Sequence, residues 1–248
     1  MNKRKLIAKN KYLSFDFIIN LLSLIIGGIC LIIVNYLIQL YRGPEILGFY
    51  SQSLAIFIIL SQLSTFGIQF STLKHISFNK TSSKKCDEIL ISAIIAVFLI
   101  SIIAGFSLFS SRFYLSELFN SPSLSKSILI VIPSIILFSI NKLFFSCLTA
   151  LGEMNTYAKY QVLRSFLYLF LLLILLISKL PNYFIFSNIL FSELIMFLVM
   201  FLYQFKLFSK NFLFINKERL RWIKLHIKFG SKTFIGGFLY ELNTRIDI

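Results

Sequence analysis

The chain has 248 residues, of which 57% are hydrophobic and only 14% are charged, and its formal net charge is +15. This composition is too apolar for a soluble globular domain. The positive charge would favour nucleic-acid binding if it lay on one folded face. It is divided among separate loops, so we expect no nucleic-acid partner.

The predicted elements are six apolar stretches that are nearly free of charged residues. A helix needs about 20 apolar residues to cross the hydrocarbon core of a bilayer. The fifth stretch is shorter than this, so we expect its helix to begin near Tyr157, with Lys159 and Arg164 extending to the headgroups. The stretches are Phe17–Tyr41, Ile46–Leu73, Ile89–Ser111, Ser127–Gly152, Ser165–Ser178 and Leu180–Phe205. The sequence therefore predicts an all-α integral membrane protein with a six-helix transmembrane bundle over 17–205.

Lysine and arginine are concentrated in alternate loops. The tail 1–16, the loop after the second stretch and the segment 206–232 are strongly basic, whereas the intervening loops carry few cations. This bias places the amino terminus in the cytoplasm. It also predicts contact with anionic membrane lipid.

The segment 206–232 is predicted to be a cytoplasmic linker that contains a helix. Its charges Lys217, Arg221, Lys224 and Lys228 recur at the spacing of one helical face. We expect an amphipathic helix over 217–228 that lies on the inner leaflet. The alternative is a solvated basic loop.

Two ionisable residues fall near the centres of predicted spans. Lys142 lies in the fourth stretch and Glu193 in the sixth. Such residues are costly in lipid and usually face a protein interior or a hydrated cavity. We interpret Lys142 as a group that attracts an anion and Glu193 as an ion-coupling group. A structural salt bridge between the two is the alternative.

Polar residues also recur on one face of each of the first two spans. Asn20 belongs to such a stripe in the first span, and Gln62 and Gln69 belong to one in the second. We expect all three to line a substrate cavity, although hydrogen bonding between helices explains such stripes as well.

The last segment, 233–248, is predicted to be the start of a seventh span that the chain leaves incomplete. It carries Glu241, Arg245 and Asp247, and the first two have the spacing of an internal ion pair. We expect Arg245 to help bind an anion, with Asp247 or Glu241 as further ion-coupling candidates.

Motifs for a catalytic nucleophile, a nucleotide site or a metal site are absent from the sequence. We therefore expect a protein that is not an enzyme, with no catalytic residues, no bound metal and no cofactor.

Four short motifs lie at or near the ends of the predicted spans. They are Arg42-Gly43-Pro44-Glu45-Ile46-Leu47-Gly48-Phe49-Tyr50, Ser64-Thr65-Phe66-Gly67-Ile68, Leu151-Gly152-Glu153-Met154-Asn155 and Asn243-Thr244-Arg245-Ile246-Asp247. In these motifs the chain resembles the polysaccharide or O-antigen flippases, in the superfamily that also contains the multidrug and toxin extruders. The likeness covers essentially the whole chain, and the motifs agree in order and in span position.

This resemblance implies a transporter of two six-helix bundles, of which the chain supplies one half and the start of the other. It implies translocation of a polyprenyl-diphosphate-linked oligosaccharide, an O-antigen or capsule repeat unit, across the bacterial inner membrane by alternating access. The cavity should then be cationic and the transport driven by an H⁺ or Na⁺ gradient. Expected partners are membrane lipid, the lipid-linked glycan, a second six-helix bundle and glycan assembly proteins.

Three other interpretations remain open at this point. A multidrug or cation antiporter of the same superfamily would need a net acidic cavity. A membrane glycosyltransferase such as an O-antigen polymerase would need a large outer loop. A truncated fragment without transport activity would associate with other membrane proteins through its helices.

Overall fold

The computed structural model describes residues 3–178, 180–207 and 217–243, and within these ranges the ordered elements are all helical. Six of the helices are long and apolar enough to cross a membrane, so the predicted all-α membrane bundle is confirmed. The elements are α1 (Lys3–Arg42), α2 (Pro44–Thr65), α3 (Ile68–Asn79), α4 (Ser83–Leu118), α5 (Leu124–Leu151), α6 (Met154–Ile177), the 3₁₀ turn η1 (Asn182–Phe186), α7 (Ser187–Leu207) and α8 (Lys217–Asn243).

The second apolar stretch is not one helix, and the predicted single span over Ile46–Leu73 is wrong. The chain bends at Phe66 and Gly67, whose φ angles are +46° and +71°, and α3 starts afresh at Ile68. Glycine adopts this left-handed conformation without a steric penalty. The 22 residues of α2 already extend about 33 Å at 1.5 Å per residue, enough for the hydrocarbon core. The bend therefore marks one end of the second span.

Arg42, the last residue of α1, holds the opposite end of the bundle together. Its guanidinium donates to the backbone oxygen of Ser178 at 2.8 Å and to Asn182 Oδ1 at 3.1 Å. A third bond reaches the Leu175 carbonyl, one of the last in α6, at 3.4 Å. A cation is favourable at the carboxyl end of a helix, where carbonyls lack intrahelical partners. The bonds join α1 to the α6–α7 turn.

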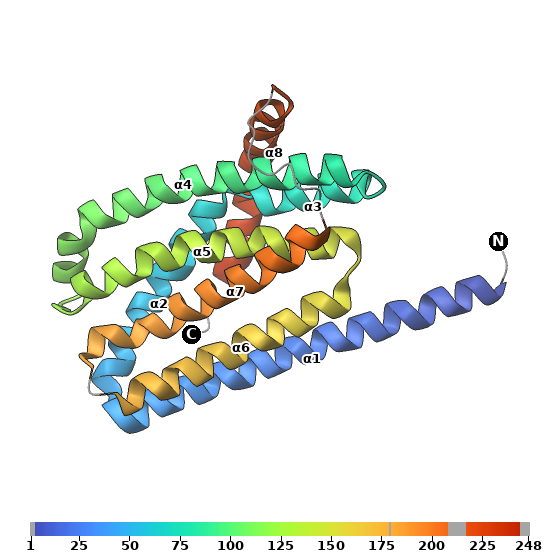
Figure 1. Ribbon diagram of the computed structural model, residues 1–248. Coiled ribbons are helices and arrows are strands. Elements are labelled where there is room, and N and C mark those ends of the chain that lie inside the picture. Colours follow the sequence, from blue (N-terminus) through green and yellow to red (C-terminus); the bar gives the residue numbers. More distant parts are fainter. Residues whose placement is uncertain (1–2, 179, 208–216, 244–248) are drawn as a thin grey trace.

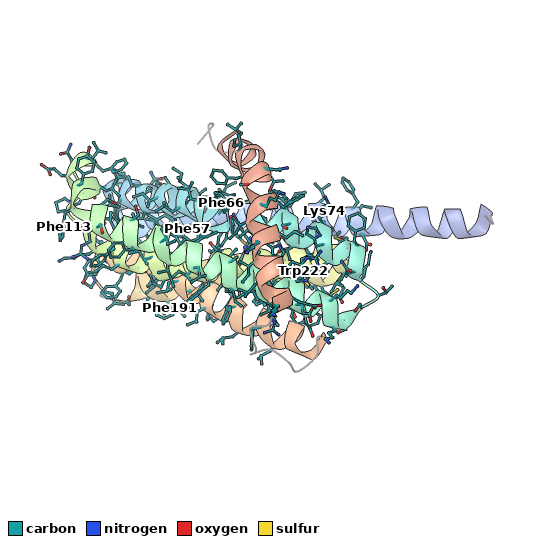
Figure 2. All side chains as sticks on the ribbon, turned by 90° about the horizontal axis from the view of Figure 1, so that it is seen from above. Phe57, Phe66, Lys74, Phe113, Phe191 and Trp222 are labelled. Atoms are coloured by element: carbon teal, nitrogen blue, oxygen red, sulfur yellow. The ribbon has the colours of Figure 1, made fainter. Side chains whose placement is uncertain are left out.

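The last described helix, α8, contains the predicted helical segment 217–228 and continues to Asn243 without a break. The solvated-loop alternative is therefore wrong. In both views α8 lies across α4 instead of beside it (Figure 1, Figure 2). It is not among the described helices that are long and apolar enough to cross a membrane.

The joint between α8 and α3 also includes the bend and α4, and residues on successive turns of α8 form it. Gly230 packs directly against the bend, because a Cβ atom built on Gly230 would lie 2.4 Å from the Phe66 oxygen. One turn earlier, the buried His226 ring contacts Ser71 Oγ at 2.9 Å and the Ile89 oxygen at 3.0 Å.

The bundle core has two parts that meet on α5. One, around Phe144, is shared by α3, α4, α5 and α7. The other, around Phe57 and Phe186, is formed mainly by α2, α5 and η1, with buried residues from α1, α4, α6 and α7. α1 and α6 run side by side at one flank of the bundle (Figure 1). The functional site lies between this pair and the helices α2, α5 and α7.

Candidate functional site

The centre of the site is the Glu193 carboxylate on α7, which is completely buried. Asn141 Nδ2 of α5 donates to its Oε2 atom at 2.7 Å, and the Tyr168 hydroxyl of α6 donates to Oε1. Asn141 also donates to the Glu193 backbone oxygen at 3.0 Å. A buried carboxylate needs such partners, because it has lost its hydration. Three helices therefore supply the environment of one acid.

The hydrogen bonds continue from Glu193 to a fourth helix. Asn188, one turn earlier on α7, donates to the Tyr168 backbone oxygen at 3.3 Å and to the Tyr50 hydroxyl of α2 at 3.4 Å. The Oδ1 atoms of Asn141 and Asn188 are buried and have no hydrogen-bond partner among the described residues. Such acceptors are unusual inside a protein and are available to a water or an ion.

Two cations lie beside this network and share one aromatic ring. Lys142 Nζ is 4.8 Å from the centroid of the Phe138 ring, and the Arg164 guanidinium carbon is 5.4 Å from it. Arg164 also lies 5.1 Å from the Phe145 ring and donates to Gln161 Oε1 at 3.3 Å. Aromatic faces attract cations, more strongly where water is excluded. The site thus combines one buried acid with two positive charges.

α6 begins at Met154, earlier than the predicted Tyr157. Arg164 therefore lies ten residues in, about 15 Å along the helix. Its guanidinium lies beside Phe138 and donates to Gln161, one turn nearer the start of α6. Its extension to the headgroups stays a prediction.

A cavity of about 290 Å³ opens beside Arg164. Its wall on the α1 side includes two glycines, and a Cβ atom at Gly28 would meet nothing within 4 Å. This volume is at the lower edge for ligand pockets, which are typically about 300–1,000 Å³. The lining residues used below are Gly27, Gly28, Phe138, Arg164, Ser165 and Tyr168.

The structure brings only some of the sequence-predicted residues to this site. Lys142 and Glu193 each contact a residue that lines the cavity: Lys142 lies at the Phe138 ring, and Glu193 accepts a hydrogen bond from Tyr168. The Glu193 carboxylate also accepts a hydrogen bond from Asn141. Asn20 donates to the Asp16 backbone oxygen of its own helix.

The remaining predicted residues lie away from the cavity, lack a described side chain, or fall outside the described residues. Gln62 is buried in α2 but does not line the cavity, and Gln69 belongs to α3 beyond the bend. Glu241 is near the end of α8, where the backbone alone is described. Arg245 and Asp247 lie outside the described residues.

Sequence reasoning missed Asn141, Arg164, Tyr168 and Asn188. A signal was present in α6, where Gln161, Arg164 and Tyr168 have the spacing of one helical face. Asn141 carries no charge, and no spacing pattern in the sequence marks it as a site residue beside Lys142.

Comparison with known proteins gives one match. A family model described as polysaccharide biosynthesis protein matches residues 10–248, nearly the whole chain. No curated protein and no solved structure matches it.

Proposed function

Because the chain belongs to the polysaccharide biosynthesis protein family, we propose that it translocates a polyprenyl-diphosphate-linked oligosaccharide across a membrane by alternating access. Its six membrane-crossing helices make it a multi-pass membrane protein. The substrate class in this proposal is an O-antigen or capsule repeat unit, and the membrane is the bacterial inner membrane, with the amino terminus in the cytoplasm.

The observation that carries the proposal is the pair of cations on the Phe138 ring beside the cavity. Lys142 and Arg164 supply positive charge inside the membrane-spanning part of the chain. A diphosphate needs such charge when it leaves water, and a guanidinium can bind phosphate oxygens through two parallel bonds. Two cations weigh against a cation antiporter, whose cavity would need net negative charge.

The proposed coupling group is Glu193. A carboxylate buried among hydrogen-bond donors can exchange an ion only when the packing around it changes, and alternation between two states provides such a change. The unpartnered oxygens of Asn141 and Asn188 lie in the same network. Exchange of H⁺ or Na⁺ at Glu193 would link substrate movement to an ion gradient, with no bond made or broken by the chain itself.

A second six-helix bundle is part of the proposal. The large apolar side chains of α1 and α6 are exposed along much of their length, among them Leu24, Ile32 and Phe170. A facing bundle would close the cavity that opens beside α1. Membrane lipid, the lipid-linked glycan and glycan assembly proteins remain proposed partners, and Arg245, Asp247 and Glu241 remain proposed site residues.

The experiment compares Arg164→Ala with Lys159→Ala, a matched control on the same helix whose cation is exposed. The intact gene product is expressed in a bacterial strain that lacks its own exporter. Lipid-linked oligosaccharide at the outer leaflet is quantified with a membrane-impermeant lectin. We expect at least a tenfold lower rate for Arg164→Ala and a near-wild-type rate for Lys159→Ala. Equal rates for the two variants, at equal protein levels, would remove the proposed anion site.

A further inference from the structure

A second cavity, of about 220 Å³, lies at the end of the bundle opposite to α3. The start of α2, the α4–α5 turn and the start of η1 form its walls, and we call it the turn pocket. Its lining residues are Glu45, Ile46, Gly48, Phe49, Gln52, Phe119, Asn120, Ser121, Pro122, Ser123 and Asn182.

The lining is a mixture of polar and apolar residues and contains no lysine or arginine. Amides and hydroxyls make up most of its polar groups, Glu45 is its one acidic residue, and Phe119, 43% exposed, offers an aromatic surface. The Oε1 atom of Gln52 is buried and has no hydrogen-bond partner among the described residues. Such an acceptor requires a donor, and a hydroxyl group is one that fits an uncharged ligand.

The pocket has open space at Gly48 and walls that are held in place. A Cβ atom built on Gly48 would meet nothing within 4 Å. Ser116 Oγ donates to the Ser121 oxygen at 2.8 Å, and Arg42 holds Asn182 Oδ1 at 3.1 Å. Hydrogen-bonded walls lose little conformational freedom when a ligand binds.

We propose that the turn pocket binds one neutral sugar ring of the glycan, in a second subsite separate from the cavity beside Arg164. This inference rests on the proposed function, which makes a lipid-linked glycan the substrate. A sugar ring offers hydroxyl donors to Gln52 and Glu45, hydroxyl acceptors to the amide N–H groups, and an apolar face to Phe119.

Two other ligand classes fit less well. A lipid phosphate would meet the Glu45 carboxylate and no cation among the lining residues. A divalent metal takes six or more oxygens within about 2.6 Å, and the described residues contain no group of three acidic, histidine or cysteine side chains that could hold one.

The test is binding of methyl glycosides to the full chain in lipid nanodiscs, measured by saturation-transfer difference NMR. The panel contains the methyl glycosides of glucose, galactose, rhamnose and N-acetylglucosamine. Gly48→Phe fills the pocket, and Gly236→Phe is the matched control, because Gly236 on α8 also has nothing within 4 Å of its Cβ position. Gln52→Ala removes the unpartnered acceptor and leaves the pocket open.

We expect saturable binding of at least one glycoside to the wild type and to Gly236→Phe, with at least a fivefold lower signal for Gly48→Phe and for Gln52→Ala. Wild-type protein that binds none of the panel, or binding that Gly48→Phe leaves unchanged, would overturn the inference. Displacement of the glycoside by glycerol phosphate would assign the pocket to lipid headgroups and overturn it as well.

The outcome can be separated from that of the transport experiment. Arg164 is not part of the turn pocket, so Arg164→Ala should bind glycosides normally. If transport depends on Arg164 but the chain binds no glycoside, the inference about the turn pocket is overturned and the proposed function stands. If Gly48→Phe abolishes glycoside binding but the wild-type chain shows no transport, the sugar site in the turn pocket is supported and the proposed function is removed.

Discussion

The side-chain amide of Asn141 donates to both the carboxylate and the backbone oxygen of Glu193, at 2.7 and 3.0 Å. One amide thereby fixes the position of a buried acid and ties α5 to α7. The next residue, Lys142, lies over the Phe138 ring instead. Adjacent residues on a helix point about 100° apart, which places the Asn141 amide against the acid and the Lys142 ammonium against the aromatic ring.

Asn141→Ala should lower the free energy of unfolding by about 2–3 kcal/mol, because it leaves a buried carboxylate with one hydrogen-bond donor fewer. The double variant Asn141→Ala/Glu193→Gln should lose less than the sum of the two single variants. Thermal unfolding of the purified protein in detergent measures all three. If the stability losses of the two single variants add up to that of the double variant, the two side chains are not coupled.

Phe138→Leu should reduce the transport rate several-fold, because it removes the aromatic ring next to both Lys142 and Arg164. Cation–π contacts contribute about 0.5–2 kcal/mol each. The control is Phe106→Leu on α4, whose side chain is 71% exposed. The lectin assay compares the two variants, and an equal effect of both would indicate general loss of packing.

Gly230→Ala should weaken the joint between α8 and α3, because its Cβ would lie 2.4 Å from the Phe66 oxygen. Overpacking of this kind typically costs about 1–3 kcal/mol. Gly236→Ala, on the same helix but with open space around it, should be neutral or slightly stabilising. Thermal unfolding reports the difference, and identical behaviour of the two variants would contradict the close contact.

Burial lowers the pKa of His226 to about 4 from its ordinary value of 6.5. The folded state therefore binds fewer protons than the unfolded state between these two pH values, so stability falls as the pH drops from 6.5 to 4. The shift corresponds to about 3 kcal/mol at 1.36 kcal/mol per pH unit.

His226→Asn removes this titration but keeps a polar side chain at the joint. The variant should therefore lose less stability than the wild type when the pH is lowered from 7 to 4. Unfolding temperatures measured at several pH values test the prediction. Parallel curves for the two proteins would show that His226 does not contribute to the acid sensitivity.

Five of the six spans could be predicted from the sequence because each is a long run of residues that is mainly apolar and nearly free of charge, and the fifth required its flanking residues as well. The bend at Phe66 and Gly67 could not be predicted, since uncharged residues continue through it to Leu73. Two residues in the left-handed conformation do not change the hydropathy profile. The role of Gly67 depends on its contact with α8, which the sequence does not show.

The candidate site was predicted in part. Lys142 and Glu193 stand out as charges in apolar stretches, and each contacts a residue that lines the cavity, Phe138 and Tyr168 respectively. Arg164 was not predicted as a site residue because the fifth span was counted from its uncharged residues, although the helix starts at Met154 and Arg164 lines the cavity. Asn141 and Asn188 carry no charge, and their importance depends on the helix rotation that places their amides against Glu193 and Tyr168.

Gly67 and Gly230 bring the bend and α8 into backbone contact, since a Cβ atom built on Gly67 would lie 2.7 Å from the Gly230 oxygen. With no side chain between the two backbones, a rotation of α8 at this point cannot be absorbed by rotamer changes. The bend where α2 ends would have to move with α8.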